Sequence, residues 1–233
     1  MFARLLMVCS VLAALSGVSS GAIIYDFGNP ASSTLTEVNA AGGMQVGDKL
    51  FADFFTDIAK SQGALAPGMD EIVVRGVDVN GDFGLIFTGL WQALGGQLAD
   101  TTITFKVTAP DGFLIKDNGL KLLAFGADNG GSVGITENVY SGPPSTSPVI
   151  ANKVVSYTRN GGVEFGTLED HKEFTPLQEI WVIKDVGASG GVNQDGFAHI
   201  SQFQQTFSQI PEPATMALLA IGGLVLLRRR RRA

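Results

Sequence analysis

Six Asn-Gly or Asp-Gly pairs divide the middle of the chain into short segments. They begin at Asn80, Asp111, Asn118, Asn129, Asn160 and Asp195. Such pairs tolerate the positive φ angles of tight hairpin turns, so each is expected to mark a turn. Between them lie short runs rich in β-branched and aromatic residues, which favour strands. Abundant Gly (30 residues) and few charged residues (16%) argue against a long-helix protein. The pattern therefore predicts an all-β fold.

Two hairpins and one alternating strand are the clearest units. Residues 72–88 predict a hairpin that turns at Asn80-Gly81, and residues 153–168 predict a second. Residues 101–108 place Ile103, Phe105 and Val107 on one face and polar residues on the other, as in a half-buried antiparallel strand. Further strands are predicted at 121–125, 132–140, 179–184 and 197–207. Strands at this spacing predict an antiparallel β-sandwich or jelly roll.

Two segments depart from this pattern. Residues 51–60 place Phe51, Phe54, Phe55 and Ile58 at helical spacing, which predicts a short helix. Residues 141–148 contain three prolines and are expected to form a loop, because proline cannot join a central ladder. Residues 23–209 show no internal repeat and no boundary, so one domain is expected.

Charge and cysteine content exclude several functions for this domain. Residues 23–210 hold 10 Lys and Arg against 21 Asp and Glu, a net charge of −11. Such a domain should repel nucleic-acid phosphates, so no nucleic-acid partner is expected. Because Cys9 is the sole cysteine and precedes the domain, disulfides, a cysteine nucleophile and Cys-ligated zinc are excluded there.

The first 22 residues have the composition of a secretory signal peptide. Arg4 supplies a positive start, residues 5–15 form an apolar run, and small residues follow as far as Ala22. This order matches a cleavable signal, so residues 1–22 predict a signal helix and export of the chain.

The other end of the chain resembles a short membrane anchor. Pro211-Glu212-Pro213 precedes a 14-residue apolar run, 214–227. As a helix that run would be about 21 Å long, short of the roughly 30 Å hydrocarbon core of a bilayer. Five arginines follow, which would stop transfer and stay cytoplasmic. They are Arg228, Arg229, Arg230, Arg231 and Arg232.

Taken in order, these parts resemble the PEP-CTERM sorting signal of bacteria. The resemblance covers 210–233 and rests on Pro211, Glu212 and Pro213, the apolar helix and the arginine cluster. It implies that an exosortase in the inner membrane recognises the tail and cleaves at or near the Pro-Glu-Pro motif. It also implies a host that makes biofilm and extracellular polysaccharide. The expected partners are exosortase, the secretion machinery, the inner membrane and extracellular polysaccharide, and the expected destination is the cell surface or matrix.

One turn has the residue types of a calcium loop. Asp78, Asn80 and Asp82 alternate as oxygen ligands do in such loops. The Gly expected at the sixth loop position is Phe83, and the acid expected at the twelfth is Gly89. Hairpin-turn chemistry explains the same residues, and no cofactor is expected.

Aromatic residues offer a candidate sugar-binding surface. Trp91 lies between glycine-containing segments and is expected in a loop, where its ring could stack on a sugar. Trp181 lies among Ile180, Val182 and Ile183 and is expected in the core. Thr102 and Thr104 begin a threonine row of the kind that ice binding needs, but Lys106 interrupts it.

Hydrolase chemistry has little support. Gly-x-Ser-x-Gly occurs at 130–134 and 187–191, and neither match leads into a helical pattern as a nucleophile elbow requires. His171 is expected in a solvated loop and His199 in a strand. The sequence predicts a non-enzymatic surface or matrix protein, with a carbohydrate-binding module as the alternative and a hydrolase as a third hypothesis.

Overall fold

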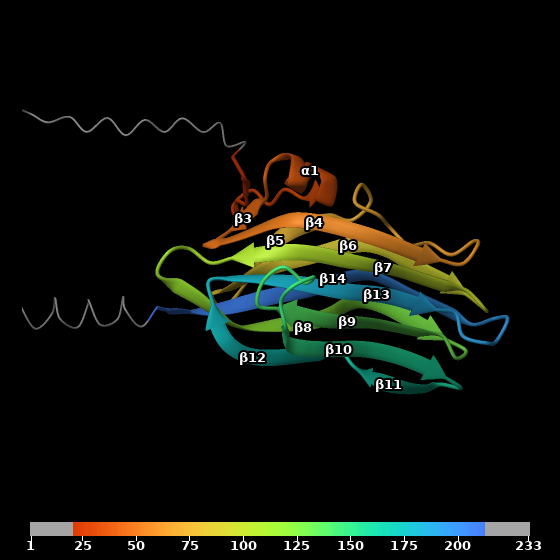
Figure 1. Ribbon diagram of the computed structural model, residues 1–233. Coiled ribbons are helices and arrows are strands. Elements are labelled where there is room, and N and C mark those ends of the chain that lie inside the picture. The colour runs from red at the N-terminus through yellow and green to blue at the C-terminus, as the bar shows by residue number, and fades with distance from the viewer. Residues whose placement is uncertain (1–20, 213–233) are drawn as a thin grey trace, which may run out of the picture.

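Two β-sheets pack face to face in the computed structural model, which describes residues 21–212 (Figure 1). Sheet A has eight strands, in the spatial order β1 (Ile23–Ile24), β3 (Met44–Val46), β4 (Lys49–Lys60), β7 (Leu98–Thr108), β13 (Glu179–Ser189), β9 (Ser132–Tyr140), β10 (Val149–Asn160) and β11 (Val163–Thr167). Sheet B has six, in the order β12 (Glu169–Leu177), β8 (Phe113–Asp128), β14 (Phe197–Pro211), β6 (Asp82–Leu94), β5 (Val73–Val79) and β2 (Ser33–Thr34).

The predicted all-β antiparallel sandwich is confirmed. Every strand pairing is antiparallel except that of β1 with β3. The chain crosses between sheets several times, so strands distant in sequence become neighbours, as β13 does with β7 and β9. Residues 1–20 of the predicted signal peptide (1–22) and the predicted transmembrane helix (214–227) lie outside the described residues.

The turn pairs behave as predicted with one exception. Asn80-Gly81 joins β5 to β6 and Asn129-Gly130 joins β8 to β9, all four residues having positive φ. Asn118-Gly119 is not a turn, because both residues lie in the middle of β8. Asn118 is fully buried there, and its side chain bonds to groups of the opposite sheet. That long-range contact overrides the local turn preference.

The predicted helix at 51–60 is wrong, because these residues belong to β4. Asp53 has a φ of 56°, and the register with β7 shifts between Ala52 and Phe55. This β-bulge adds a residue to the strand, so Phe51 and Phe54 both face the interior. A bulge therefore produced the three-residue spacing that imitates a helix.

The helix of the described residues is α1 (Leu35–Ala40), which precedes β3. Thr34 accepts a hydrogen bond from the Glu37 backbone, and the Glu37 carboxylate accepts one from the Thr34 backbone. This capping box starts the helix. Leu35 and Val38 are its buried residues and attach it to the sandwich.

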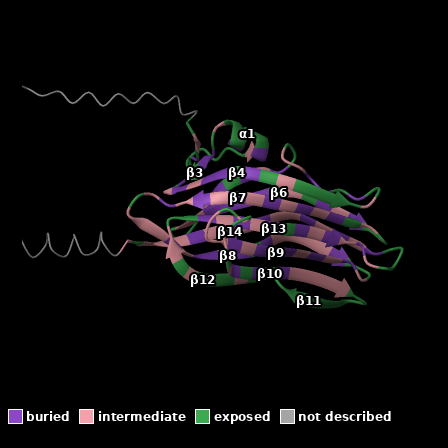
Figure 2. Cartoon of the chain, viewed as in Figure 1, coloured by how far each residue is buried: buried purple, intermediate pink, exposed green. Residues whose placement is uncertain are grey.

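The core lies between the two sheets and contains a series of contacting aromatic rings. Phe54 stacks on Phe105 in sheet A, Phe105 contacts Phe87 in sheet B, and Phe87 stacks on Phe203. Buried residues alternate along the central strands, whereas the edge strand β11 is exposed throughout (Figure 2). Ile103, Phe105 and Val107 are fully buried, which confirms the alternation predicted for β7.

Candidate functional site

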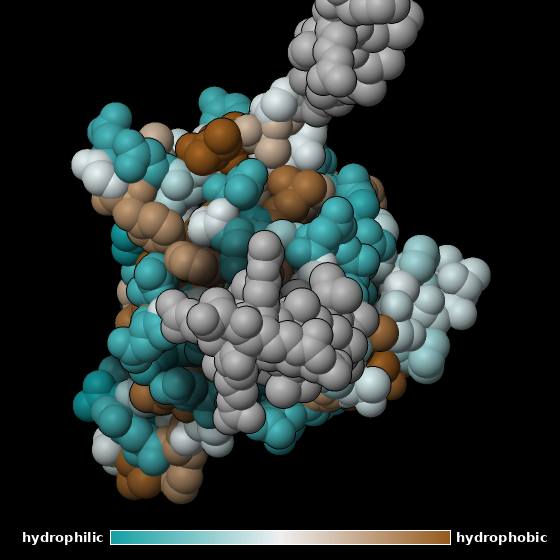
Figure 3. All heavy atoms as spheres, turned by 90° about the vertical axis from the view of Figure 1, so that its left-hand side faces the viewer, coloured by the Kyte–Doolittle hydropathy of each residue, from teal (hydrophilic) through white to brown (hydrophobic). Residues whose placement is uncertain are grey.

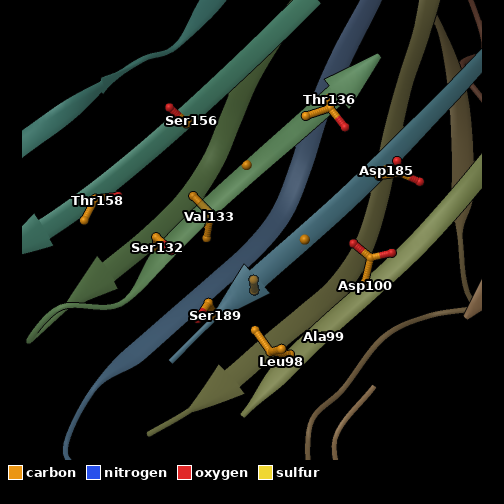
Figure 4. Close-up of a pocket in the computed structure, with 13 residues that line it drawn as sticks. Leu98, Ala99, Asp100, Ser132, Val133, Thr136, Ser156, Thr158, Asp185 and Ser189 are labelled. Carbon is orange, nitrogen blue, oxygen red and sulfur yellow. The ribbon is translucent and has the colours of Figure 1, made fainter. Parts of the chain in front are cut away.

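A shallow trough crosses the outer face of sheet A (Figure 4). It has a volume of about 470 Å³ and is lined by residues of β7, β13, β9 and β10. These strands are neighbours in the sheet, so the trough runs across the strands rather than along them. At the usual strand spacing, four strands span about 15 Å.

Strand register creates the floor of this trough. Asp100, Gly187, Gly134 and Ser156 lie directly opposite one another on the four successive strands. Two adjacent glycines at the centre of this row leave the backbone bare. The rows on either side carry longer side chains, which form the walls. They are Leu98, Ser189, Ser132 and Thr158 on one side and Asp185 and Thr136 on the other.

Two carboxylates stand at one end of the trough. A Cβ atom added at Gly187 would lie 3.2 Å from Asp100 Oδ2, so the Asp100 side chain leans over the glycine floor. Thr102 Oγ1 donates a hydrogen bond of 2.6 Å to Asp185 Oδ1. Burial raises the pKa of Asp100 above its usual value, and the nearby charge of Asp185 adds to the effect. The trough thus combines hydroxyls, carboxylates and bare backbone.

The two carboxylates lie on one face of the sheet. Glycoside hydrolysis uses a pair of carboxyl groups that flank the scissile bond. Asp100 and Asp185 rise from the adjacent strands β7 and β13 on the same face of one sheet. Both would therefore meet a bound sugar from the same side.

A second polar cluster joins three strands of sheet B. His171 Nε2 lies 3.2 Å from Asp117 Oδ1, and Ser208 Oγ donates to Asp117 Oδ2. Burial would raise the pKa of Asp117, but the hydrogen bonds from Ser208 and His171 outweigh it and lower that pKa. Both neighbours use the carboxylate, and the described contacts include no bond between Ser208 and His171. Among the described contacts, the Ser208 hydroxyl is therefore bonded to a carboxylate and not to the histidine of a Ser-His pair. His171 lies in strand β12, so its predicted loop position is wrong, although its side chain is exposed as expected.

The predicted calcium residues form a hairpin turn. The Gly81 backbone N–H donates to Asp78 Oδ1 at 2.7 Å, and Asn80 has a φ of 57°. Among residues 21–212, no three His, Cys, Asp or Glu side chains are grouped to hold a metal ion. The calcium site of Asp78, Asn80 and Asp82 stays a prediction without further support.

The burial of both tryptophans differs from the prediction. Trp91 is not in a loop but inside β6, fully buried against Phe203, because Ala93 and Phe87 share its inward face. Its ring is inaccessible to a sugar. Trp181 is not in the core: its neighbours Ile180 and Val182 face inward, while its ring lies half-buried beneath the Lys106 ammonium group, 5.8 Å from the ring centre.

The last strand runs directly into the predicted sorting signal. Strand β14 ends at Pro211, which pairs with Phe113, and the Glu212 backbone N–H donates to Gly112 O at 2.8 Å. Residue 212 leaves from the end of the sandwich that Figure 3 shows, where hydrophilic residues surround separate hydrophobic ones. Pro213 and Arg228–Arg232 lie outside the described residues. Between residues 21 and 212, no helix has the length and apolar character to cross a bilayer.

A family model described as the PEP-CTERM protein-sorting motif matches residues 209–232. The chain carries a PEP-CTERM sorting motif. This confirms the resemblance drawn from Pro211-Glu212-Pro213 and the arginine cluster, and it indicates an exported protein that an exosortase processes. The PEP-CTERM motif accounts for the tail and leaves the sandwich unassigned.

The solved structures to which this chain shows a low similarity include carbohydrate-binding modules. TmCBM61 in complex with β-1,4-galactotriose is 12% identical, with a TM-score of 0.29, covering 67% of this chain and 88% of the module. The family 11 module from Clostridium thermocellum, in complex with a β-1,3-1,4-mixed-linked tetrasaccharide, is 12% identical, with a TM-score of 0.22 and coverage of 64% and 87%. The arabinose-bound α-L-arabinofuranosidase MgGH51 is 11% identical, with a TM-score of 0.26 and coverage of 83% and 30%. No curated protein matches this PEP-CTERM sequence.

Proposed function

We propose that this PEP-CTERM protein is a non-enzymatic surface or matrix protein and that its trough binds an extracellular polysaccharide. The observation that carries the proposal is the glycine-floored row of Asp100, Gly187, Gly134 and Ser156 across four strands. A sugar ring can rest on the bare backbone, and the flanking hydroxyls and carboxylates can bond to its hydroxyl groups.

The negative charge of the trough limits which polysaccharides can bind there. Asp100 and Asp185 are close enough to raise the pKa of Asp100, and residues 23–210 carry a net charge of −11. An acidic polysaccharide would be repelled, because like charges brought together cost free energy. We therefore propose a neutral or amino-sugar polymer.

The sorting motif supports the proposed destination. After removal of the signal peptide, the tail of residues 214–232 would hold the chain in the inner membrane until an exosortase acts near Pro211–Pro213. The sandwich would then be released to the cell surface or the matrix, where the polymer lies. No catalytic step is part of the proposal.

Affinity electrophoresis of the full chain tests the binding. We expect gels that contain neutral or amino-sugar polysaccharide from the producing strain to slow the protein, and gels that contain an acidic polysaccharide to leave its mobility unchanged. Unchanged mobility in every polysaccharide would contradict the proposed function. The intact mass of protein released from the producing cells tests the destination. A product ending near Pro211–Pro213 supports sorting, and a full-length mass that keeps Arg232 contradicts it.

A further inference from the structure

Three charged residues lie side by side in the interior of sheet A. Lys153 of β10, Glu137 of β9 and Lys184 of β13 are directly opposite one another in the strand register. All three are fully buried. Lys153 Nζ lies 2.6 Å from Glu137 Oε1, and Lys184 Nζ lies 3.0 Å from Glu137 Oε2. One carboxylate therefore forms ion pairs with two ammonium groups.

Sheet B supplies an amide to each lysine. Lys153 Nζ donates to Asn118 Oδ1, and Asn118 Nδ2 donates to Glu137 Oε1 at 2.7 Å. Lys184 Nζ donates to Gln205 Oε1, and Gln205 Nε2 donates to Glu137 Oε1 at 3.0 Å. Both the amine of Lys153 and the amide nitrogen of Asn118 thus touch the same carboxylate oxygen.

The cluster has one positive charge too many for an apolar interior. Two ammonium groups and one carboxylate leave a surplus charge where no group is exposed, and an uncompensated buried charge is costly. Loss of one lysine proton removes the surplus. A lysine that has lost its proton is a neutral amine, which is the nucleophilic form.

We propose that Lys153 and Asn118 form an intramolecular amide, an isopeptide bond that links sheet A to sheet B. Neutral Lys153 Nζ attacks Asn118 Cγ and forms the new C–N bond. Glu137 Oε1 accepts a proton from the attacking nitrogen and delivers it to Asn118 Nδ2. The Cγ–Nδ2 bond then breaks and ammonia leaves. The amine and the amide become a secondary amide plus ammonia, Glu137 ends as a carboxylate again, and no oxidant or other reactant is needed.

Two observations favour this pair over Lys184 and Gln205. Glu137 Oε1 touches both the nucleophile and the leaving nitrogen of the first pair, whereas the second pair uses both carboxylate oxygens. The Lys184 ammonium also lies 4.9, 5.2 and 5.2 Å from the ring centres of Phe87, Phe105 and Phe203, and these contacts oppose the burial that lowers the pKa of Lys184 to about 8. After the reaction, Lys184 and Glu137 remain as a balanced ion pair.

Mass spectrometry of the full chain, denatured and reduced, tests the bond. We expect the residues around Asn118 and Lys153 to lack the mass of one ammonia. Trypsin does not cleave after an acylated lysine, so the digest should contain a branched peptide joining 117–121 to 122–159. The mass loss alone does not identify the bond, because Asn118 precedes Gly119 and an Asn-Gly pair can also lose ammonia by cyclising onto its own backbone. The branched peptide distinguishes the two reactions.

Two variants distinguish formation of the isopeptide bond from cyclisation of Asn118 onto its own backbone. Lys153→Arg keeps the positive charge but should abolish the branched peptide, whereas the matched Lys184→Arg should retain it. Wild-type chain with no ammonia loss overturns the proposal, and this measurement needs no variant to fold. Ammonia loss that persists in Lys153→Arg, or a branch that joins Lys184 to Gln205, overturns the assignment as well.

Discussion

Pro211, the first residue of the Pro-Glu-Pro tripeptide in the PEP-CTERM motif, pairs with Phe113 at the end of sheet B. The next backbone group, the Glu212 N–H, is also bonded, to Gly112 O. The motif therefore begins inside the sheet rather than after a linker. An exosortase that acts near Pro211–Pro213 must meet a strand end that has separated from β8.

A flexible linker before the motif should speed its processing. Inserting about six Gly and Ser residues between Ile210 and Pro211 would expose the motif without loosening the strand. We expect pulse-chase labelling in the producing strain to show several-fold faster conversion of precursor to product. The same insertion between Ser145 and Thr146, in the loop at 141–148, is the control. Equal processing rates for both insertions would show that the pairing of Pro211 does not limit access.

Trp91 should matter for stability and not for binding. Its ring is fully buried, so Trp91→Ala should lower the free energy of unfolding by about 3–5 kcal/mol, the usual cost of such truncations. Its Nε1 has no hydrogen-bond partner within the described structure, so Trp91→Phe should cost less. Denaturant titration measures both. A stable Trp91→Ala chain that no longer binds polysaccharide would restore the role as a sugar platform.

The carboxylate of Glu137 should stabilise the fold above pH 4.5. Burial alone would raise its pKa, but the ammonium groups of Lys184 and Lys153 lower it from 4.5 to about 2. Because the folded pKa is the lower one, the stabilisation is present above the unfolded value and is lost as pH falls towards about 2.

Glu137→Gln tests this contribution, because it leaves the buried Lys184 ammonium group without a counter-charge. We expect a loss of about 3–5 kcal/mol at neutral pH, shrinking as pH falls from 4.5 to about 2. Glu169→Gln, which removes an exposed pair with Lys121, should change stability by less than about 1 kcal/mol. A deficit for Glu137→Gln that does not vary with pH would contradict the assigned ion pairs.

Asp100 in the trough should change the pH dependence of stability in the opposite direction. Its folded pKa is raised by burial and by Asp185, so the native state binds more protons than the unfolded chain above pH 3.8. Stability should therefore fall as pH rises through that window, and Asp100→Asn should remove this part of the fall. Melting temperatures of both proteins at pH 4 and pH 7 measure the effect, in which the wild type gains less than the variant from the higher pH. Parallel pH dependence would show that neither burial nor Asp185 raises the pKa of Asp100.

Local patterns predicted the strands because burial on one face leaves an alternating signature. Ile103, Phe105 and Val107 show this alternation in β7. Asn80-Gly81 marks the turn between β5 and β6, because both residues have positive φ. The same rule fails at Asp53, where a bulge adds a residue and shifts the period. It also misplaces the tryptophans, since Trp181 and Ile180 are adjacent in an apolar run, and only the pairing of β13 decides which faces inward.

The residues that meet in the trough and in the buried cluster could not be paired from sequence, because both sites depend on register between distant strands. Gly134 and Gly187 meet only when β9 pairs with β13. A signal for the cluster was present, however. Glu137 lies between Ile135 and Val139, and both lysines likewise have buried apolar residues two positions away on each side. A charged residue on the apolar face of an alternating strand indicates a buried polar partner.

Filling the trough tests its role as a polysaccharide site most directly. A Cβ atom at Gly134 would come no closer than 3.5 Å to its neighbours, so Gly134→Trp can fold while its ring occupies the trough. Gln204→Trp, on the outer face of sheet B beside Lys121, is the matched control. In affinity electrophoresis with the producing strain's polysaccharide, we predict at least about tenfold weaker binding for Gly134→Trp, corresponding to about 1.4 kcal/mol, and wild-type binding for Gln204→Trp. Wild-type binding by a folded Gly134→Trp chain would contradict the account.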